Sequence, residues 1–438
     1  MKKINFDWDR SKQYFFLYPP MALLEPLHPD VLFRKELALY FHVPFCEKKC
    51  TYCYYVSLPK NQQKDEIVQR YFEALKSEFR MYIKLLKHMK VVIKSIYFGG
   101  GTPTLVAPKY LIELIDMVYD NFEVSEEIEI TTDSCPSTLS EENIGRLKEN
   151  KVNRVCMGVQ TFNDDILKRI NRSHTAELAV EKLGLLKKMG IQERIIDIMY
   201  GLPNQSLDQF HKDIQVIKEM EPEGVSFYKL SIRPSTEMYH SLNQRDDRYP
   251  SNEDISEFID TLIREMRSAA YKHVASPSFS KQPYDFKHQH HCWSGGEYIG
   301  MGVSSFSYFN NFTYTNVRSI SKYLKCIEEG TFPLDVGKEL SSIERLHRDV
   351  SFQVKLLEIE RVKLSQKHGI NVSEYFQDEF GFLLANNLAC EKPERNELYV
   401  TDHGVEYNDS ISRIFYSSSI NDQLDRINTA DNLKRNLI

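Results

Sequence analysis

Short β-rich runs alternate with longer segments of helical period along the first half of this 438-residue chain. The predicted strands span residues 37–43, 91–98, 127–132, 154–160, 194–200 and 225–232. The predicted helices that follow them span residues 67–89, 110–119, 141–149, 176–189 and 207–220. Strands and helices in this alternation form βα units around a parallel sheet. The sequence therefore predicts an α/β fold, a partial (β/α)6 barrel of TIM type, with functional residues at the carboxyl ends of its strands.

The alternation ends near residue 250, so we expect the chain to have four parts. These are an N-terminal extension (1–36), the barrel (37–250), an extension of the barrel (251–340) and a small C-terminal domain (341–438). The last part has the pattern helix, helix and short strand, which favours a mostly helical, winged-helix-like domain. Pro19 and Pro20 favour an extended N-terminal segment that can lie over the barrel mouth as a lid.

Composition and charge exclude several classes of protein. Hydrophobic residues make up 42% of the chain and charged residues 27%, a balance typical of a globular protein. A net charge of -6 offers no basic field to a nucleic acid. Charged residues interrupt the N-terminal segment, and no apolar run reaches the roughly 18 residues of a membrane span. We expect a cytoplasmic monomer that acts on a small-molecule substrate, with neither a nucleic acid nor a membrane as partner.

Three cysteines follow the first predicted strand in the string HVPFCEKKCTYCYY. Cys46, Cys50 and Cys53 thus lie at the functional end of the barrel. Thiolates are the usual ligands of iron–sulfur clusters, and three of them leave one iron of a four-iron cluster open for catalysis. A zinc site is the nearest rival and needs four ligands, for which His42 is available. The other five cysteines are expected to be small buried hydrophobic residues: Cys135, Cys156, Cys292, Cys326 and Cys390.

A glycine run ends the second predicted strand in the string YFGGGTPT. Gly99, Gly100, Gly101 and Thr102 expose backbone N–H and C=O groups and let a ligand come close. Taken alone, the run is equally compatible with a tight turn from strand to helix. Its position beside the cysteine triad favours a binding loop.

Together these motifs resemble those of a known family. The strings LYFHVPFC, YFGGGTPT, RVCMGVQTFND, IDIMYGLP and YIGMGVSSFS, between residues 37 and 309, are similar to the oxygen-independent coproporphyrinogen III oxidase family of radical S-adenosylmethionine (SAM) enzymes. That family includes the oxidase, the radical SAM heme chaperones and the class C radical methylases. The resemblance implies a [4Fe–4S] cluster on the three cysteines, whose open iron chelates SAM, and an electron donor such as flavodoxin or ferredoxin.

The resemblance also implies roles for individual residues. Tyr40 should lie near the cluster and the adenosyl group, and the glycine run should bind the methionine amino group. Where the family usually has a glutamate, the string TTDSCPS places Asp133, whose side chain is one methylene shorter. A shifted ribose or a bridging water would follow. Further polar contacts to SAM are implied for Gln160, Arg172, Asp197 and Ser231.

The subgroup depends on shorter strings. A second SAM molecule, as in the oxidase and the class C methylases, would be held in the 251–340 region by Gly300, Gly302, Ser304 and Phe306. The heme chaperones have the motif H-N-x-x-Y-W, and the corresponding string in this chain is HQHHCW at 288–293. The alternative interpretation of this string is a solvated polar loop. The oxidase ends its cysteine motif with an extra thiol, where this chain has Tyr54 and Tyr55.

A YPP element in the N-terminal extension is similar to the class C methylases. We therefore predict a radical SAM methyl or methylene transferase that uses two SAM molecules and acts on an sp2 carbon of a small natural product. The alternatives are a heme chaperone, in which His288, His290, His291 and Cys292 offer ligands to heme iron, and a coproporphyrinogen III dehydrogenase.

Overall fold

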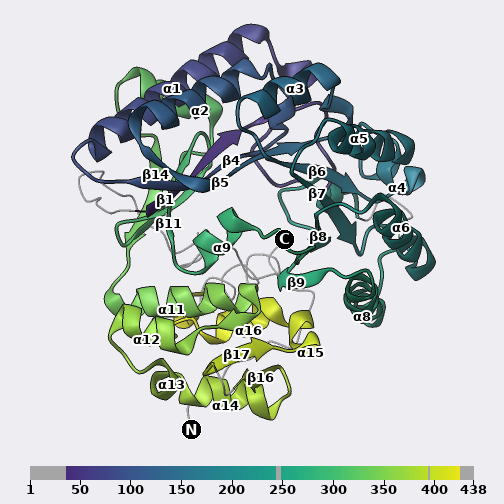
Figure 1. Cartoon of the computed structure of the whole chain (residues 1–438), viewed down its shortest axis with the longest axis vertical. Coiled ribbons are helices and arrows are strands. Elements are labelled where there is room, and N and C mark those ends of the chain that lie inside the picture. The colour runs from purple at the N-terminus through teal and green to yellow at the C-terminus, as the bar shows by residue number, and fades with distance from the viewer. Residues whose placement is uncertain (1–35, 243–247, 393–394, 425–438) are drawn as a thin grey trace, which may run out of the picture.

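One large mixed sheet organises the computed structural model, which describes residues 36–242, 248–392 and 395–424 (Figure 1). Its centre is six parallel strands: β1 (Glu36–Val43), β4 (Val92–Gly100), β5 (Glu123–Ser134), β6 (Arg154–Gln160), β7 (Glu193–Tyr200) and β8 (Gly224–Lys229). The outermost strands of the sheet do not pair with each other among these residues, so the barrel is open. The predicted partial (β/α)6 barrel is thus confirmed, and each strand lies within a few residues of its expected place.

Helices cover the outer face of the six parallel strands (Figure 1). They are α1 (Asp65–Leu86), α2 (Lys109–Asn121), α3 (Glu141–Glu149), α4 (Asp164–Arg169), α5 (Ala176–Lys188) and α6 (Leu207–Met220), with α8 (Asn252–Ser268) beside α6. Local sequence fixes where several of them begin. Ser140, Thr175 and Ser206 each accept a backbone N–H from the first turn of α3, α5 and α6. The apolar faces of these helices and the strands form one continuous core.

Two extensions widen the sheet beyond the six strands. On one side β11 (Glu297–Met301) pairs with β1 in parallel, and β12 (Phe306–Phe309), β13 (Phe312–Asn316) and β14 (Leu334–Glu339) follow antiparallel. On the other side β10 (Ser278–Ser280) and β9 (Lys272–Ala275) continue from β8. Helix α10 (Ile320–Glu328) packs on α1. The side chains of these extensions belong to the same core as the barrel.

The histidine-rich string forms a helix, α9 (Lys287–Trp293), inside the curve of the sheet (Figure 1). The expectation of a solvated polar loop is wrong here. The amides of Lys287 and His288 donate to the buried Glu129 carboxylate, and Ser95 Oγ lies 2.8 Å from His288 Nδ1. Because these partners lie toward the amino ends of the strands, α9 closes the barrel at the end opposite the cysteines.

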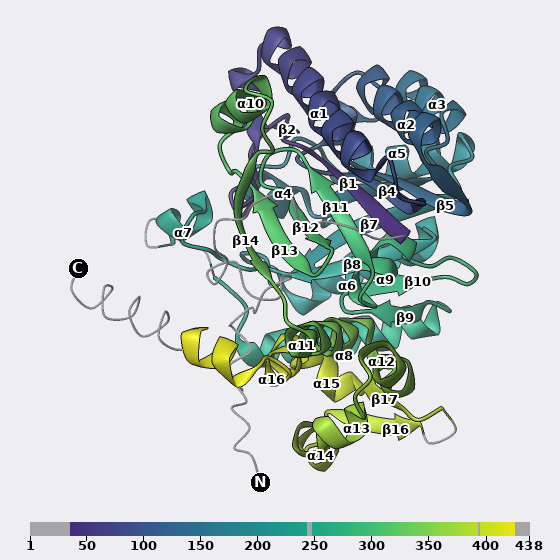
Figure 2. The same ribbon diagram turned by 90° about the vertical axis from the view of Figure 1, so that its left-hand side faces the viewer.

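The C-terminal domain begins at α11 (Ser342–Gln353) and has a core of its own. Its small sheet has the order β15 (Glu358–Ile359), β17 (Glu397–Val400), β16 (Ala389–Lys392). The helices around the sheet are α12 (Arg361–His368), α13 (Val372–Tyr375), α14 (Gln377–Ala385), α15 (Asp402–Glu406) and α16 (Asn408–Ile414). Three short strands among helices give the expected mostly helical, winged-helix-like character, and Figure 2 shows this domain against one end of the barrel.

The predicted lid lies almost entirely outside the described residues, which begin at Glu36. Within the described part of the chain, no helix combines the length and the apolarity needed to cross a bilayer.

Candidate active site

A cavity of about 520 Å³ opens at the carboxyl ends of the parallel strands. This volume lies within the range of about 300–1,000 Å³ that is common for small-molecule and cofactor sites. Twelve of the residues predicted from the sequence line it: Tyr40, Cys46, Cys50, Cys53, Gly100, Gly101, Thr102, Asp133, Gln160, Arg172, Asp197 and Ser231. Motifs from six different strands thus converge on one site, as expected for a barrel of this type.

The glycine run holds the cysteine loop in place. The loop begins with β2 (Phe45–Cys46), which pairs with β3 (Leu58–Pro59). The amide of Gly101 donates to Val43 O at 2.8 Å, and the amide of Thr102 donates to Phe45 O at 2.7 Å. Gly100 has φ of +109°, and a Cβ there would overlap the His42 ring. Only glycine fits this approach, so the run supports the thiols as well as lining the cavity.

The spacing of the thiols distinguishes the two metal sites that the sequence left open. Zinc–sulfur bonds of about 2.3 Å place two thiolates of one zinc ion roughly 3.8 Å apart. Among the described residues, the cysteine sulfurs do not form a group within 4.8 Å of one another. His42 is also engaged, since Nδ1 lies 3.1 Å from Tyr40 Oη and Nε2 lies 3.3 Å from Val56 O. The thiols thus do not form a compact zinc-like group in this structure, and this arrangement is compatible with a larger iron–sulfur cluster.

Burial keeps two of these thiols protonated in the free protein. It raises the pKa of Cys46 to about 12 and of Cys53 to about 11, with neighbouring cysteines adding to the effect. Thiolates, and not thiols, bind iron, so loading of a cluster must release protons.

Two carboxylates face the same cavity. Tyr97 donates to Asp133 at 2.6 Å, yet burial still raises the pKa of Asp133 to about 6. Burial, with the charge of Asp133, raises the pKa of Asp197 to about 8. The Asp133 carboxylate also packs on Gly99, where a Cβ would lie only 2.9 Å from Oδ2, although Gly99 itself does not line the cavity. A cationic ligand with hydroxyl groups would satisfy both carboxylates, and SAM has these properties.

Gln160 and Arg172 complete the polar wall. Gln160 ends β6 in a left-handed conformation, with φ of +73°, which is unusual for a residue with a side chain and common at functional sites. Arg172 donates to Gly158 O, to Cys50 Sγ at 3.2 Å and to Cys135 Sγ at 3.4 Å. Its buried Nε has no partner in the described part of the chain. The guanidinium is thus available to a carboxylate ligand.

One part of the cavity, formed by the ends of β7 and β8 and by the C-terminal domain, is rich in tyrosine and was missed by the sequence analysis. Tyr200, Tyr228 and Tyr407 line this part, whereas Tyr52, Tyr54 and Tyr55 line the cavity from the cysteine loop. Residues 405–410 of the C-terminal domain form part of the wall, and Lys355 Nζ there lies 2.5 Å from Asp409 Oδ1. The C-terminal residues have no motif that would have identified them, because they reach the site only through the packing of the two domains.

The four residues predicted to hold a second SAM lie outside this cavity. Gly300 is opposite Tyr40 in the β1–β11 pair, and Gly302 donates its amide to the buried Glu78 at 2.8 Å. Ser304 has φ of +58° and donates its amide to Val317 O, and Phe306 begins β12. Each residue has a local structural task, so the second SAM molecule stays a prediction.

The string HQHHCW is also largely engaged. His288 is held by Ser95 and packs against Tyr97 with the two rings tilted, Cys292 is buried, and His291 Nε2 lies 2.9 Å from Glu297 O. His290 is exposed. Of the other cysteines expected to be buried, Cys135 and Cys156 are buried, but Cys390 is exposed and Cys326 is partly exposed. In both of these the thiol lies on the surface of a helix or edge strand, which the sequence did not reveal.

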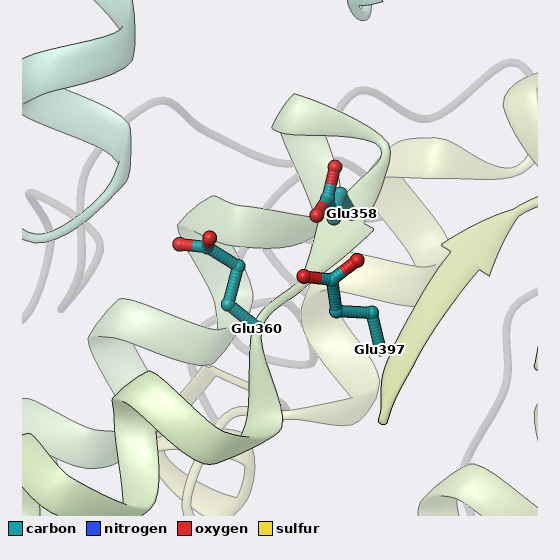
Figure 3. A group of neighbouring side chains, drawn as sticks. All are labelled: Glu358, Glu360 and Glu397. Carbon is teal, nitrogen blue, oxygen red and sulfur yellow. The ribbon is translucent and has the colours of Figure 1, made fainter. Parts of the chain in front are cut away.

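A group of carboxylates lies elsewhere, in the C-terminal domain. Oxygens of Glu358, Glu360 and Glu397 lie within 4.8 Å of one another (Figure 3). Lys363 pairs with Glu360, and Tyr399 donates to Glu397 at 2.7 Å. These neighbours account for the group as a surface cluster, and we assign no site to it.

Comparisons with known proteins identify the family of the chain. The radical SAM superfamily model matches residues 40–217. Over 270 residues the chain is 32% identical to the heme chaperone HemW of Buchnera aphidicola, covering 61% of this chain and 69% of that protein. Over 435 residues it is 25% identical to the oxygen-independent coproporphyrinogen III oxidase of Helicobacter pylori, covering 92% and 91%. The solved structure of coproporphyrinogen III oxidase HemN from Escherichia coli has a TM-score of 0.80 at 22% identity, covering 95% of this chain and all of that one, which concerns the fold alone.

Proposed function

Because the chain belongs to the radical SAM superfamily, in the family of HemW heme chaperones and oxygen-independent coproporphyrinogen III oxidases, we propose that it cleaves SAM reductively to activate a small organic substrate. The superfamily implies a [4Fe–4S] cluster and SAM. The observation that carries the proposal is the single cavity that joins the cysteine triad, the predicted SAM contacts and a separate tyrosine-rich half.

The side chains that line the cavity suit a [4Fe–4S] cluster and SAM. Cys46, Cys50 and Cys53 would hold the cluster, and its open iron with bound SAM would supply one-electron chemistry that produces a carbon radical. Arg172 would pair with the SAM carboxylate, and Asp197 would accept hydrogen bonds from the ribose. The tyrosine-rich half then holds the substrate, and the C-terminal domain excludes water from it.

The remaining half of the cavity gives a general picture of the substrate. Tyrosine side chains offer flat apolar faces together with hydroxyl groups. This lining suits an unsaturated or aromatic molecule with polar groups. We propose hydrogen-atom transfer from a carbon of such a molecule to the 5′-deoxyadenosyl radical, which becomes 5′-deoxyadenosine, followed by loss of a small leaving group or of an electron to an external acceptor.

Electrons for the reaction must reach the cysteine loop from outside. Lys48 and Lys49 are exposed on that loop, between two of the predicted cluster ligands. Their charge favours a small acidic redox protein, so we propose flavodoxin or ferredoxin as the donor.

The test is anaerobic reconstitution with iron and sulfide, reduction with dithionite, and measurement of 5′-deoxyadenosine by mass spectrometry. We expect about one four-iron cluster per chain and formation of 5′-deoxyadenosine from SAM. The variant with Cys46, Cys50 and Cys53 all changed to Ala should lose both. Cysteine variants that retain the cluster, or a loaded wild type that never cleaves SAM, would refute the proposal.

Methyl transfer with a second SAM is the finer function that the sequence favoured. This function requires Gly300, Gly302, Ser304 and Phe306 to bind the second SAM. In the structure these residues instead make backbone contacts within the β1–β11–β12 region. The compared relatives are a chaperone and an oxidase. We therefore do not carry methyl transfer forward, and a product heavier by one methyl or methylene group is the outcome that would restore it.

Heme binding is a second candidate, supported by the HemW relatives and by one exposed histidine, His290. Engagement of His288 and burial of Cys292 oppose the full ligand set that the sequence offered. Addition of heme to wild type and to His290→Ala, followed by the Soret band, separates the two functions. Tight heme binding that depends on His290, without SAM cleavage, would replace the enzymatic proposal.

A further inference from the structure

A fourth thiol faces the cavity of the cysteine triad. Cys135 follows β5, is 5% exposed and lines the same cavity as Cys46, Cys50 and Cys53. The sequence suggested only a small buried hydrophobic residue. The surroundings of its sulfur are polar, however, and this calls for a different explanation.

Hydrogen-bond donors surround the Cys135 sulfur. Arg172 Nη2 donates to it at 3.4 Å, while Ser137 Oγ, which donates to Glu47 at 2.6 Å, lies 3.4 Å away and Ser173 Oγ lies 3.6 Å away. His174 Nδ1 also lies 3.6 Å away, while His174 Nε2 lies 3.2 Å from Val159 O. A carbonyl only accepts, so Nε2 carries a proton and Nδ1 is left to take the thiol proton. Such an environment stabilises a thiolate.

The contrast with a neighbouring thiol supports this reading. Burial opposes ionisation of Cys135, but Arg172 and His174 outweigh it and lower its pKa to about 6. Cys156 lines the same cavity, and there burial raises the pKa far above the usual range. Two buried cysteines on one wall thus differ in protonation, and the difference follows from their neighbours.

Arg172 connects Cys135 to the triad. The two terminal nitrogens of its planar guanidinium contact Cys50 Sγ and Cys135 Sγ, so one side chain spans the gap between the two sulfurs. Hydrogen bonds to sulfur of this kind are common around iron–sulfur clusters. The triad provides three of four thiolates, and the fourth thiolate in this cavity is the one best prepared to bind iron.

We propose that Cys135 is the fourth protein ligand of the resting cluster and binds the iron that the triad leaves open until SAM arrives. The inference rests on the proposed function of the site. Cys135 would bind iron as the thiolate that Arg172 and His174 stabilise, and the iron–sulfur bond would replace a bond from iron to water. When SAM binds, its amino and carboxylate groups would replace Cys135 on the iron, the iron–sulfur bond to Cys135 would break, and Cys135 would return as a thiolate to its hydrogen-bond donors.

Mössbauer and EPR spectra of the anaerobic, reconstituted full chain test the proposal. Without SAM, wild type and Cys156→Ala should show four equivalent thiolate-bound irons, and Cys135→Ala should show one distinct iron site. With SAM, all three proteins should show the same distinct site. Identical SAM-free spectra in wild type and Cys135→Ala would overturn the inference, while SAM cleavage in those samples would leave the proposed function intact.

Alkylation of the wild type gives a second measurement that does not depend on any variant. Iodoacetamide labelling followed by peptide mapping should modify Cys135 at least about tenfold more slowly in the SAM-free cluster-loaded protein than in the cluster-free protein. Cys326, which lies outside the cavity, should react equally in both and serves as the internal control. Equal labelling of Cys135 in the two forms would contradict iron binding, even if Cys135→Ala fails to fold.

Discussion

The floor of the barrel, which is the end at the amino ends of the strands that α9 closes, is held together by the buried Arg154. Substitution of Arg154 is a sharp test of the structure. Arg154 Nη1 lies 3.0 Å from Glu129, 2.9 Å from Glu193 and 2.7 Å from the carbonyl of Asp285. The side chains of Arg154 and Glu129 are both 2% exposed. The arginine thereby joins β5, β6 and β7 to the segment that leads into α9.

Changing Arg154 to Met should cost about 3–5 kcal/mol of unfolding free energy at pH 8, because a buried carboxylate loses its partner. Arg70→Met is the matched control, since Arg70 and Glu328 form a surface pair with side chains 57% and 53% exposed. Exposed pairs contribute about 0–1 kcal/mol. The double variant Arg154→Met/Glu129→Gln should recover part of the loss.

The penalty should also depend on pH. Burial already raises the pKa of Glu193 to about 7, so this group stabilises the fold most below its unfolded pKa and loses that contribution as pH rises through about 7. Without Arg154 the pKa of Glu193 rises further. The Arg154→Met penalty should therefore be smaller at pH 5.5 than at pH 8.

Urea unfolding of the cluster-free protein at both pH values measures the penalty, and hydrogen exchange locates it. The amides of Lys287 and His288, which donate to Glu129, should exchange faster in Arg154→Met than in Arg70→Met. A penalty no larger than that of Arg70→Met, or one independent of pH, would refute this account of the floor.

Three further predictions concern the site. SAM affinity should rise as pH increases from about 7 to about 9, because Asp197, with a pKa of about 8, must ionise to accept hydrogen bonds from the ribose hydroxyls; Asp197→Asn should bind more weakly and without this pH dependence in calorimetry. Charge reversal of Lys48 and Lys49 should slow reduction by flavodoxin about tenfold at low salt and leave dithionite reduction unchanged, as followed by stopped-flow absorbance. Gly100→Ala should impair cluster loading, because φ of +109° and the His42 ring exclude a side chain; Gly184→Ala, in α5 with nothing within 4 Å of the added Cβ, should load normally by iron analysis.

Much of the barrel was predictable because its signals are local. The β6 strand and α3 helix begin and end at the predicted residues, since apolar periodicity and caps such as Ser140 lie in the segments themselves. The cysteine triad and the glycine run were predictable for the same reason. Both are short strings at strand ends.

The elements that were missed depend on contacts between distant segments. The string GGEYIGMGVSSFSYF contains β11 and β12, but Gly302 and Ser304 adopt positive φ between them and interrupt the pattern of a strand. Helix α9 has no apolar face that marks it as a helix, and its first amides are held by Glu129, more than 150 residues earlier. No sequence window contains such partners.

Cys135 shows the same limit at the level of chemistry. Its sequence neighbourhood, TTDSCPS, supplies Ser137, but His174 and Arg172 come from the turn after α4. Sequence spacing separates these groups from the thiol by almost 40 residues, and the parallel order of β5 and β6 brings them together at one strand end. An isolated cysteine in a sequence therefore gives no measure of its reactivity, which is set by donors that only the fold assembles.

The two halves of the cavity consequently carry different kinds of information. The half around the triad consists of motifs at the ends of the barrel strands. The chemistry that starts the reaction can therefore be predicted from the sequence. The other half takes part of its wall from residues 405–410, which pack there from a domain with a separate core. Substitutions in this wall can change which molecule fits without moving the cysteines, and substrate choice within this family can diverge while the cluster site is kept.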